Sequence, residues 1–463
     1  MGRLWKEWKK KHRYREVAMV CFPLVMSMAA ITVMEFTDRV FLSNYSLNAI
    51  SAVTPAGIAV FLIVAFFGGV AGYTNVFIAQ YCGAGAHKRV GVALWQGVYF
   101  SLFSGILAAF AVTFIAKPLF ALAGHAPDIQ KLEIIYFKIL GWGSIFHIGN
   151  HALSGFFAGR GITRPVMIIN AIGMAVNIPL DYALINGIWI FPELGITGAA
   201  IATVASWGLI TLLFSCMIFT RANHKAFLTR YGRYDPDIFF RLMRFGVPGA
   251  MQFSMDILAF TFFVFMVGRI GKTELAVSNI VISINSLAFM PAMGFSYGVS
   301  ALVGQALGRQ QPEEAKLAAW SAIHILLAYT FIIDLLFLFA PNSVLSVFIP
   351  AIQAADYAAV METGIALLRI VAAYILMDAL YMTFAGVLKG AGDTHFIMWS
   401  IGFVSLFVMI LPVYIGIEIF QQGINYAWMC VLMFITSLFI VTSARYRQGK
   451  WKKMLVMERE LVA

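Results

Sequence analysis

Long apolar stretches separated by short polar turns run along almost the whole chain, beginning at Val17. Many of them hold about 20 residues with few charges, which is the length an α-helix needs to cross a bilayer. The pattern predicts twelve membrane-spanning helices, at residues 17–42, 49–78, 90–115, 130–156, 165–186, 196–219, 240–268, 275–305, 318–340, 356–387, 396–417 and 424–444. We therefore expect an all-α polytopic membrane protein.

Composition agrees with this pattern. Of the 463 residues, 61% are hydrophobic and only 12% are charged, whereas soluble domains carry roughly 25% charged residues. The four cysteines lie in separate apolar stretches, without metal-ligand spacing or a disulfide framework, so we expect small core residues.

The net charge of +11 is distributed in a way that argues against nucleic-acid binding. Lysine and arginine gather at both termini and in every second turn, while the other turns hold few. The positive-inside rule then predicts a multi-pass protein of the cell (inner) membrane with both termini cytoplasmic. The basic segment 1–16 precedes an apolar run that is too long for a signal peptide, so we expect an uncleaved first span.

An internal repeat divides the chain. Pro23 and Pro248 are separated by the same number of residues as Gln80 and Gln305, and further matches follow in nearly the same register. We expect two six-helix bundles, at 17–221 and 237–446, joined by a cytoplasmic linker at 222–236 and followed by a cytoplasmic tail at 447–463. Because six is even, the bundles are predicted to be related by a pseudo-two-fold axis along the membrane normal.

Acids inside the predicted spans are the informative positions, because a charge is costly within the bilayer. In the first half, Asp181 follows Asn177 by one helical turn, and Pro179 between them interrupts the backbone hydrogen-bond ladder. Carboxylate, amide and freed carbonyl oxygens can hold Na⁺, or can tune a carboxyl group to exchange a proton. Asp38 is a second candidate, although it could also cap or pair near the outer interface.

In the second half, Asp256 shares a helical face with Gln252, and Asp378 is flanked by Tyr374 and Tyr381 at helical spacing. These aromatic rings favour a substrate cavity. Asn279 is a candidate cavity residue that could equally hold helices together.

A metal site is not expected. His147 and His151 are one turn apart, a spacing that could ligate a metal, but no third ligand lies nearby in the sequence. The sequence also contains no Walker A motif, so we expect neither ATP use nor any cofactor.

The pattern Met34-Glu35-Phe36-Thr37-Asp38, the stretch NIPLDY from Asn177, and Gly386–Thr394 (GVLKGAGDT) carry a family resemblance. With them the chain resembles the multidrug and toxic compound extrusion (MATE) family, in its NorM and DinF branches, over nearly all of both halves. The resemblance implies cation-coupled export of lipophilic, often cationic small molecules by alternating access. It also implies coupling roles for Asp38, Asn177, Asp181, Thr203, Asp256 and Asp378.

Two departures leave the coupling ion open between H⁺ and Na⁺. Asp256 stands where the NorM branch usually has glutamate, and Asp181 stands where NorM-type chains often have asparagine. One alternative is a lipid-linked saccharide flippase, which would usually line its cavity with basic residues; only Arg39, Lys138 and Arg369 qualify. An integral-membrane enzyme is another alternative, but no clustered catalytic motif supports it. We expect a transporter that is not an enzyme, acting as a monomer among membrane lipids.

Overall fold

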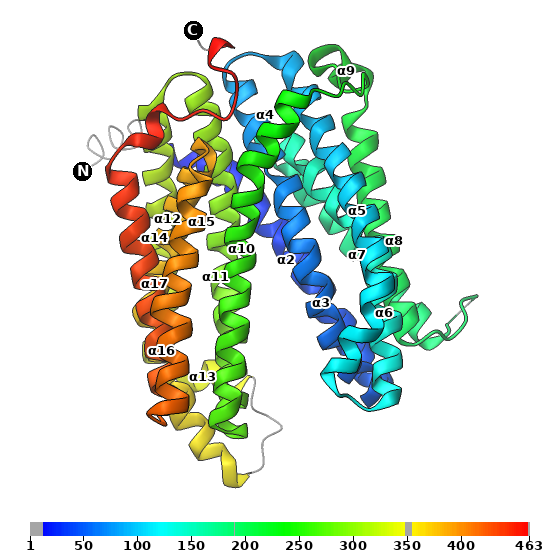
Figure 1. Cartoon of the computed structure of the whole chain (residues 1–463), viewed down its shortest axis with the longest axis vertical. Coiled ribbons are helices and arrows are strands. Elements are labelled where there is room, and N and C mark those ends of the chain that lie inside the picture. Colours follow the sequence, from blue (N-terminus) through cyan, green and yellow to red (C-terminus); the bar gives the residue numbers. More distant parts are fainter. Residues whose placement is uncertain (1–12, 189, 348–353, 462–463) are drawn as a thin grey trace. The chain divides into compact units, whose positions relative to one another are not determined.

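A computed structural model describes residues 13–188, 190–347 and 354–461, and within these ranges every regular element is a helix (Figure 1). Residues 1–12 of the expected basic N-terminal segment lie outside the described residues. An all-helical chain is the expected outcome, because a helix satisfies its own backbone hydrogen bonds where lipid offers none.

The elements follow one another with short connections. They are α2 (Tyr14–Tyr45), α3 (Leu47–Gly72), α4 (Thr74–Gly83), α5 (His87–Ala123), α6 (Pro127–Gly159), α7 (Arg164–Asn186), α8 (Ile196–Ile218), α9 (Arg221–Phe227), α10 (Pro236–Ile270), α11 (Lys272–Gly308), α12 (Pro312–Phe339), α13 (Pro341–Ser346), α14 (Ala354–Ala391), α15 (Thr394–Val404), η1 (Ser405–Ile410), α16 (Leu411–Tyr414), η2 (Ile415–Ile419), α17 (Ile424–Arg447), η3 (Lys450–Lys453) and η4 (Arg459–Leu461).

Eleven helical stretches among the described residues are long and apolar enough to cross a membrane. The remaining predicted span, 130–156, corresponds to α6, which is 33 residues long but is not among the eleven. The packing explains why α6 is less apolar: it contacts α3, α4, α5 and α8. A helix covered by protein on several sides needs small and polar residues for helix contacts more than it needs a lipid-facing surface.

The span at Thr394–Ile419 departs from regular α-helix. Ser405–Ile410 and Ile415–Ile419 are π-helical, on either side of a short α-helical turn that contains Pro412. The repeat makes this span the counterpart of α7, which stays α-helical in spite of Pro179. Hydropathy predicted the span but not its wider turns.

The chain forms two compact units. Unit 1 comprises residues 1–22, 251–303 and 311–454, and unit 2 comprises 23–250, 304–310 and 455–463. The chain therefore passes from one unit to the other inside α2, α10 and α11. The predicted bundles, 17–221 and 237–446, follow the sequence repeat rather than this division, and they stay a prediction.

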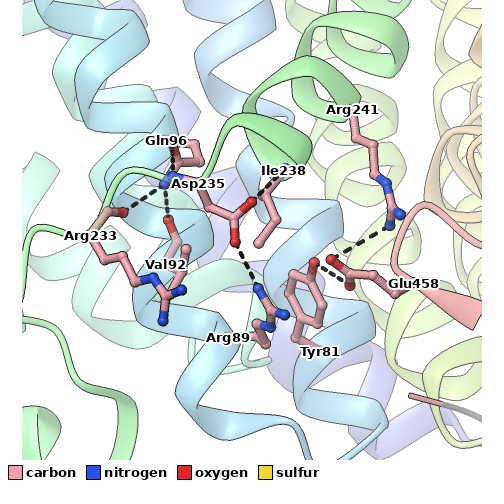
Figure 2. Close-up of polar contacts among 9 residues, drawn as sticks. All are labelled: Tyr81, Arg89, Val92, Gln96, Arg233, Asp235, Ile238, Arg241 and Glu458. Atoms are coloured by element: carbon pink, nitrogen blue, oxygen red, sulfur yellow. Dashed lines mark hydrogen bonds and ion pairs between the residues drawn. The ribbon is translucent and has the colours of Figure 1, made fainter. Parts of the chain in front are cut away.

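In unit 2, hydrogen bonds and an ion pair bind the segment 222–236 to α5 (Figure 2). Asp235 pairs with Arg89, with the Oδ2 and Nη1 atoms 2.8 Å apart, and its Oδ1 accepts from the backbone N–H of Ile238. The Gln96 amide donates to the carbonyl of Arg233 at 2.9 Å. The same aspartate thus caps the start of α10 and holds the linker against the preceding helices.

In unit 1, α14 packs against both α12 and α17. Beyond the end of α14, the Arg445 guanidinium binds both carboxylate oxygens of Asp393, at 2.6 and 3.1 Å. This two-point contact fixes the turn between α14 and α15 to the last turns of α17.

Candidate functional site

Two predicted acids of unit 2 meet inside the helix bundle. Asp38 comes from the second half of α2, and Asp181 comes from α7, one turn beyond Asn177. Asn177 and Asp181 are fully buried, and Asp38 is 6% exposed. Arg39, the residue after Asp38, is exposed. The two neighbours therefore lie on different faces of α2, as the helical repeat predicts.

The side chain that contacts this pair most directly is Tyr136 of α6. Its hydroxyl donates a hydrogen bond to Oδ2 of Asp38 at 3.0 Å. The other Asp38 oxygen, both carboxylate oxygens of Asp181 and both polar atoms of the Asn177 amide are buried without a partner. An unsatisfied buried polar group costs about 1–3 kcal/mol, and a charged one costs more.

The unsatisfied atoms have a simple chemical reason. Asp38 and Asp181 interact electrostatically, yet two ionised carboxylates are both acceptors and cannot bond to each other. One proton on either carboxyl would supply the missing donor. A Na⁺ ion would instead use the same oxygens as ligands, together with the Asn177 carbonyl. The geometry therefore suits the uptake of one cation by the pair.

Pro179 adds a further acceptor on the same helix. Proline lacks an N–H, so the carbonyl of Ala175, one turn earlier, loses its usual helical donor. Thr203 is buried on α8, which packs against α7. Its predicted coupling role stays a prediction.

The predicted acids of unit 1 lie on α10 and α14. Asp378 is buried and Asp256 is partly exposed, and the two carboxylates interact electrostatically. The amide of Gln252 donates to the hydroxyl of Tyr381 at 3.1 Å. The hydroxyl of Tyr374 and the carbonyl oxygen of Gln252 are buried without a partner. The aromatic flanks predicted for Asp378 are thus buried beside polar groups that a ligand could satisfy.

The sequence did not predict that a lysine interacts with this second acid pair. Lys389, from the last turn of α14, interacts electrostatically with Asp256. Tyr136, the one tyrosine of α6, was also missed, since nothing in the sequence shows that it faces Asp38. Lys389 could have been found, because its place in GVLKGAGDT puts it three helical turns after Asp378, close to the same face of α14.

Two further candidates look different in the structure. Asn279 on α11 is exposed, while its neighbour Ser278 is buried and accepts a hydrogen bond from the Trp428 indole at 3.2 Å. The contact between helices is therefore made by Ser278, and the cavity role of Asn279 stays a prediction. The His147 ring packs edge-on against the rings of His151 and Trp207, with ring centroids 5.2 and 4.6 Å apart. Among the described residues, no group of three or more potential ligands could hold a metal ion.

The long apolar helices with buried acids define a polytopic α-helical membrane protein. The chain belongs to the MatE family, whose model matches residues 23–183 and 248–415, more than half of the sequence. This confirms the family predicted from the motifs. Because the family comprises transporters, it also confirms that the chain is not an enzyme.

Relatives and solved structures agree with this assignment. A probable multidrug resistance protein NorM from Thermotoga maritima is 27% identical over 475 residues, covering 99% of this chain and 98% of that protein. The structure of a MOP superfamily transporter from Pyrococcus furiosus matches with a TM-score of 0.86 at 21% identity, covering 96% of this chain and 97% of that one. The structure of a multidrug resistance MATE family transporter in an outward-facing conformation gives the same values. The predicted fold class, an all-α membrane protein of two helical lobes, is confirmed.

Proposed function

We propose that the chain exports lipophilic, often cationic small molecules in exchange for H⁺ or Na⁺, by alternating access between the predicted bundles 17–221 and 237–446. Membership in the MatE family supports transport, and the multidrug resistance named for its relatives supports this substrate class. No other cofactor is required by the proposal.

The observation that carries the proposal is the enclosed pair of Asp38 and Asp181. Its unpartnered oxygens, with the unpartnered amide oxygen of Asn177, favour a state in which one external cation is bound. If the cation-bound and cation-free states prefer different conformations, cation binding and substrate release are linked through one equilibrium. Thr203, Asp256 and Asp378 complete the proposed coupling set. The proposed substrate cavity includes Gln252, Asn279, Tyr374 and Tyr381.

Efflux from vesicles tests the proposal. Purified protein is reconstituted, and efflux of ethidium is followed with a proton gradient and a sodium gradient imposed separately. We expect one of the two gradients to drive efflux. Asp181→Asn should abolish this efflux, because the variant cannot neutralise an incoming cation at the unpartnered carboxylate.

Asp334→Asn is the matched control. Asp334 is also an acid within a candidate span and has an unpartnered buried oxygen, but it lies on α12, apart from both acid pairs in the sequence. This variant should keep the gradient response. Unchanged ethidium efflux by Asp181→Asn, at equal protein in the vesicles, would overturn the assignment of the coupling site.

The proposal also includes the membrane in which the protein acts and the orientation of its termini. The alternation of basic and non-basic turns favours the cell membrane, with both termini cytoplasmic. The exposed apolar side chains of the helices favour direct contact with lipid, and we take the transporter to act as a monomer.

A further inference from the structure

Part of the segment that follows α17 binds to α4 through backbone hydrogen bonds and buried side chains. The backbone N–H groups of Val456 and Met457 both donate to the side-chain oxygen of Gln80, at 2.8 and 3.4 Å. Gln80 is fully buried, and Val456 and Met457 are buried in the same apolar cluster as Ile238 and Leu242 of α10. A chain end held by paired backbone bonds and buried side chains is anchored, not merely lying on the surface.

The next residue adds a charged contact at the same place (Figure 2). The hydroxyl of Tyr81 donates to Glu458 Oε2 at 2.8 Å, and Arg241 of α10 lies 3.6 Å from Glu458 Oε1. Glu458 therefore joins α4 to α10 through one carboxylate. Hydrogen bonds to an ionised acceptor are stronger than neutral ones.

The glutamine that holds the segment also takes part in a close helix crossing. A Cβ added at Gly308 would overlap the backbone carbonyl oxygen of Gln80, and a Cβ added at Gly83 would overlap that of Gln305. Both contacts lie within unit 2, which includes residues 304–310. Only glycine allows the ends of α4 and α11 to approach this closely.

The two contacts are related by the sequence repeat. Gln80 and Gln305 are repeat partners, and Gly83 and Gly308 have the same separation. Each glutamine carbonyl faces the glycine of the other half, which is the reciprocal pattern that a two-fold relation produces. Only one member of the pair holds the C-terminal segment, since the Gln305 amide donates to Gly159 instead.

We propose that the crossing of α4 and α11 at Gly83 and Gly308 is a closed gate of the transporter, and that Leu455–Glu458 is a latch that keeps it closed. This inference rests on the proposed function, because alternating access requires such a crossing to open. Gln80 contacts Gly308 through its backbone and the latch through its side chain. Separating the crossing therefore disturbs the latch, and a docked latch opposes the separation.

The segment that precedes the latch is anchored in unit 1. The Trp451 ring stacks on Tyr446 at 5.3 Å, and Lys452 pairs with Glu313 at 2.6 Å. The chain passes into unit 2 after Met454. The few residues from Trp451 to Val456 reach at most about 18 Å when fully extended. A movement of α4 away from the Trp451 anchor beyond this reach must release one of the two anchors.

Cys82 is a reporter placed at the gate, two residues after Gln80 and next to Gly83. In a full-length background with Cys21, Cys216 and Cys430 replaced by serine, its reaction rate with a membrane-impermeant maleimide is measured in vesicles that expose the C-terminus. Glu458→Ala should raise the rate about fivefold or more, because the bonds from Tyr81 and Arg241 are lost. Glu458→Gln, which keeps an acceptor without the charge, should give an intermediate increase.

Glu460→Ala is the matched control, since Glu460 is exposed two residues further along. Its labelling rate should equal that of the parent. Val456→Asp, which places a charge in the apolar cluster, should open the gate at least as much as Glu458→Ala. Equal rates for the parent and for Glu458→Ala and Val456→Asp, or an equal rise in Glu460→Ala, would overturn the latch. If Val456→Asp fails to reach the membrane, the labelling rates of Glu458→Ala and Glu458→Gln still test the latch.

The labelling assay needs neither substrate nor gradient. Ethidium efflux is measured on the same vesicles, so that the two proposals fail separately. Absence of gradient-driven efflux by the parent would overturn the proposed function. An unchanged labelling rate would overturn the latch alone.

Discussion

Unit 2 and unit 1 each enclose a pair of acids, but only unit 1 sets a lysine beside its pair. Lys389 is partly buried and interacts electrostatically with Asp256, whereas Arg39, which interacts with Asp38, is exposed. Among the described residues, no salt bridge reaches Asp38 or Asp181. In addition, Asp181 is fully buried while Asp256 is partly exposed.

The difference bears on which pair depends on an external cation. A buried charge is tolerated when a partner of opposite sign is built into the fold, and an uncompensated one is strongly destabilising. The pair in unit 1 has a built-in partner and some access to solvent. In unit 2 the cation that interacts with Asp38, Arg39, is exposed, and Asp181 is fully buried. We therefore infer that this pair depends more strongly on the incoming H⁺ or Na⁺.

Neutralising each pair in turn gives the largest expected effect. The double variant Asp38→Asn with Asp181→Asn should lose gradient-driven ethidium efflux completely, and it should be no worse than Asp181→Asn alone. Residues that act as one unit are not additive, because removing one already prevents the cation from binding. The double variant Asp256→Asn with Asp378→Asn should keep a gradient response, reduced about tenfold. Loss of the response in the unit 1 variant, with retention in the unit 2 variant, would reverse the comparison.

Removing one tyrosine hydroxyl from each site should have a smaller effect. Tyr136→Phe deletes the hydrogen bond that the Tyr136 hydroxyl donates to Asp38. Because this bond stabilises the ionised, cation-free carboxylate, its loss should raise the affinity of the pair for the coupling ion about tenfold. Tyr374→Phe is the matched change in unit 1, where the hydroxyl has no partner, and it should alter the affinity by less than about twofold. The measurement is the H⁺ or Na⁺ concentration that gives half-maximal efflux. Similar shifts in both variants would remove the distinction between the sites.

The membrane spans and the buried acids of unit 2 could be predicted from the sequence. Asp181 and Asn177 stood out because their spacing puts two costly polar side chains on one face of an apolar helix. Tyr136 did not stand out, because its role depends on how α6 is rotated against α2, and hydropathy carries no such information. The span 130–156 was predicted from length, although α6 is covered by other helices.

The latch and the π-helical turns could not be predicted from the sequence, for a different reason. The tail 447–463 was expected only as a cytoplasmic extension, since Val456 and Met457 are too few to make a periodic pattern. Their burial depends on Gln80, which is distant in the chain. The turns at Ser405–Ile410 pack against α17, and Pro412 follows them in the chain. The apolar pattern alone did not predict their π-helical form.

The smallest expected effect tests whether the unsatisfied polar groups of the unit 2 site lower the stability of the protein for the sake of cation binding. Both polar atoms of the buried Asn177 amide lack a partner, so Asn177→Leu should relieve an unsatisfied group and raise stability by about 1 kcal/mol. The same variant should lose affinity for the coupling ion, because a potential ligand is gone. Stability and function are thus predicted to change in opposite directions, which is common where a site is kept ready for a ligand.

Asn150 provides the matched change in the same unit. Its amide donates to the Trp207 carbonyl at 3.1 Å, and its oxygen accepts from Thr211 at 2.8 Å. Asn150→Leu should therefore lower stability by about 1 kcal/mol, since both hydrogen bonds of the amide are lost. Thermal unfolding in detergent, with and without Na⁺ and at two pH values, measures both variants. If Asn177→Leu were destabilised as much as Asn150→Leu, the Asn177 amide would be a structural group, and the cation site would reduce to the two carboxylates.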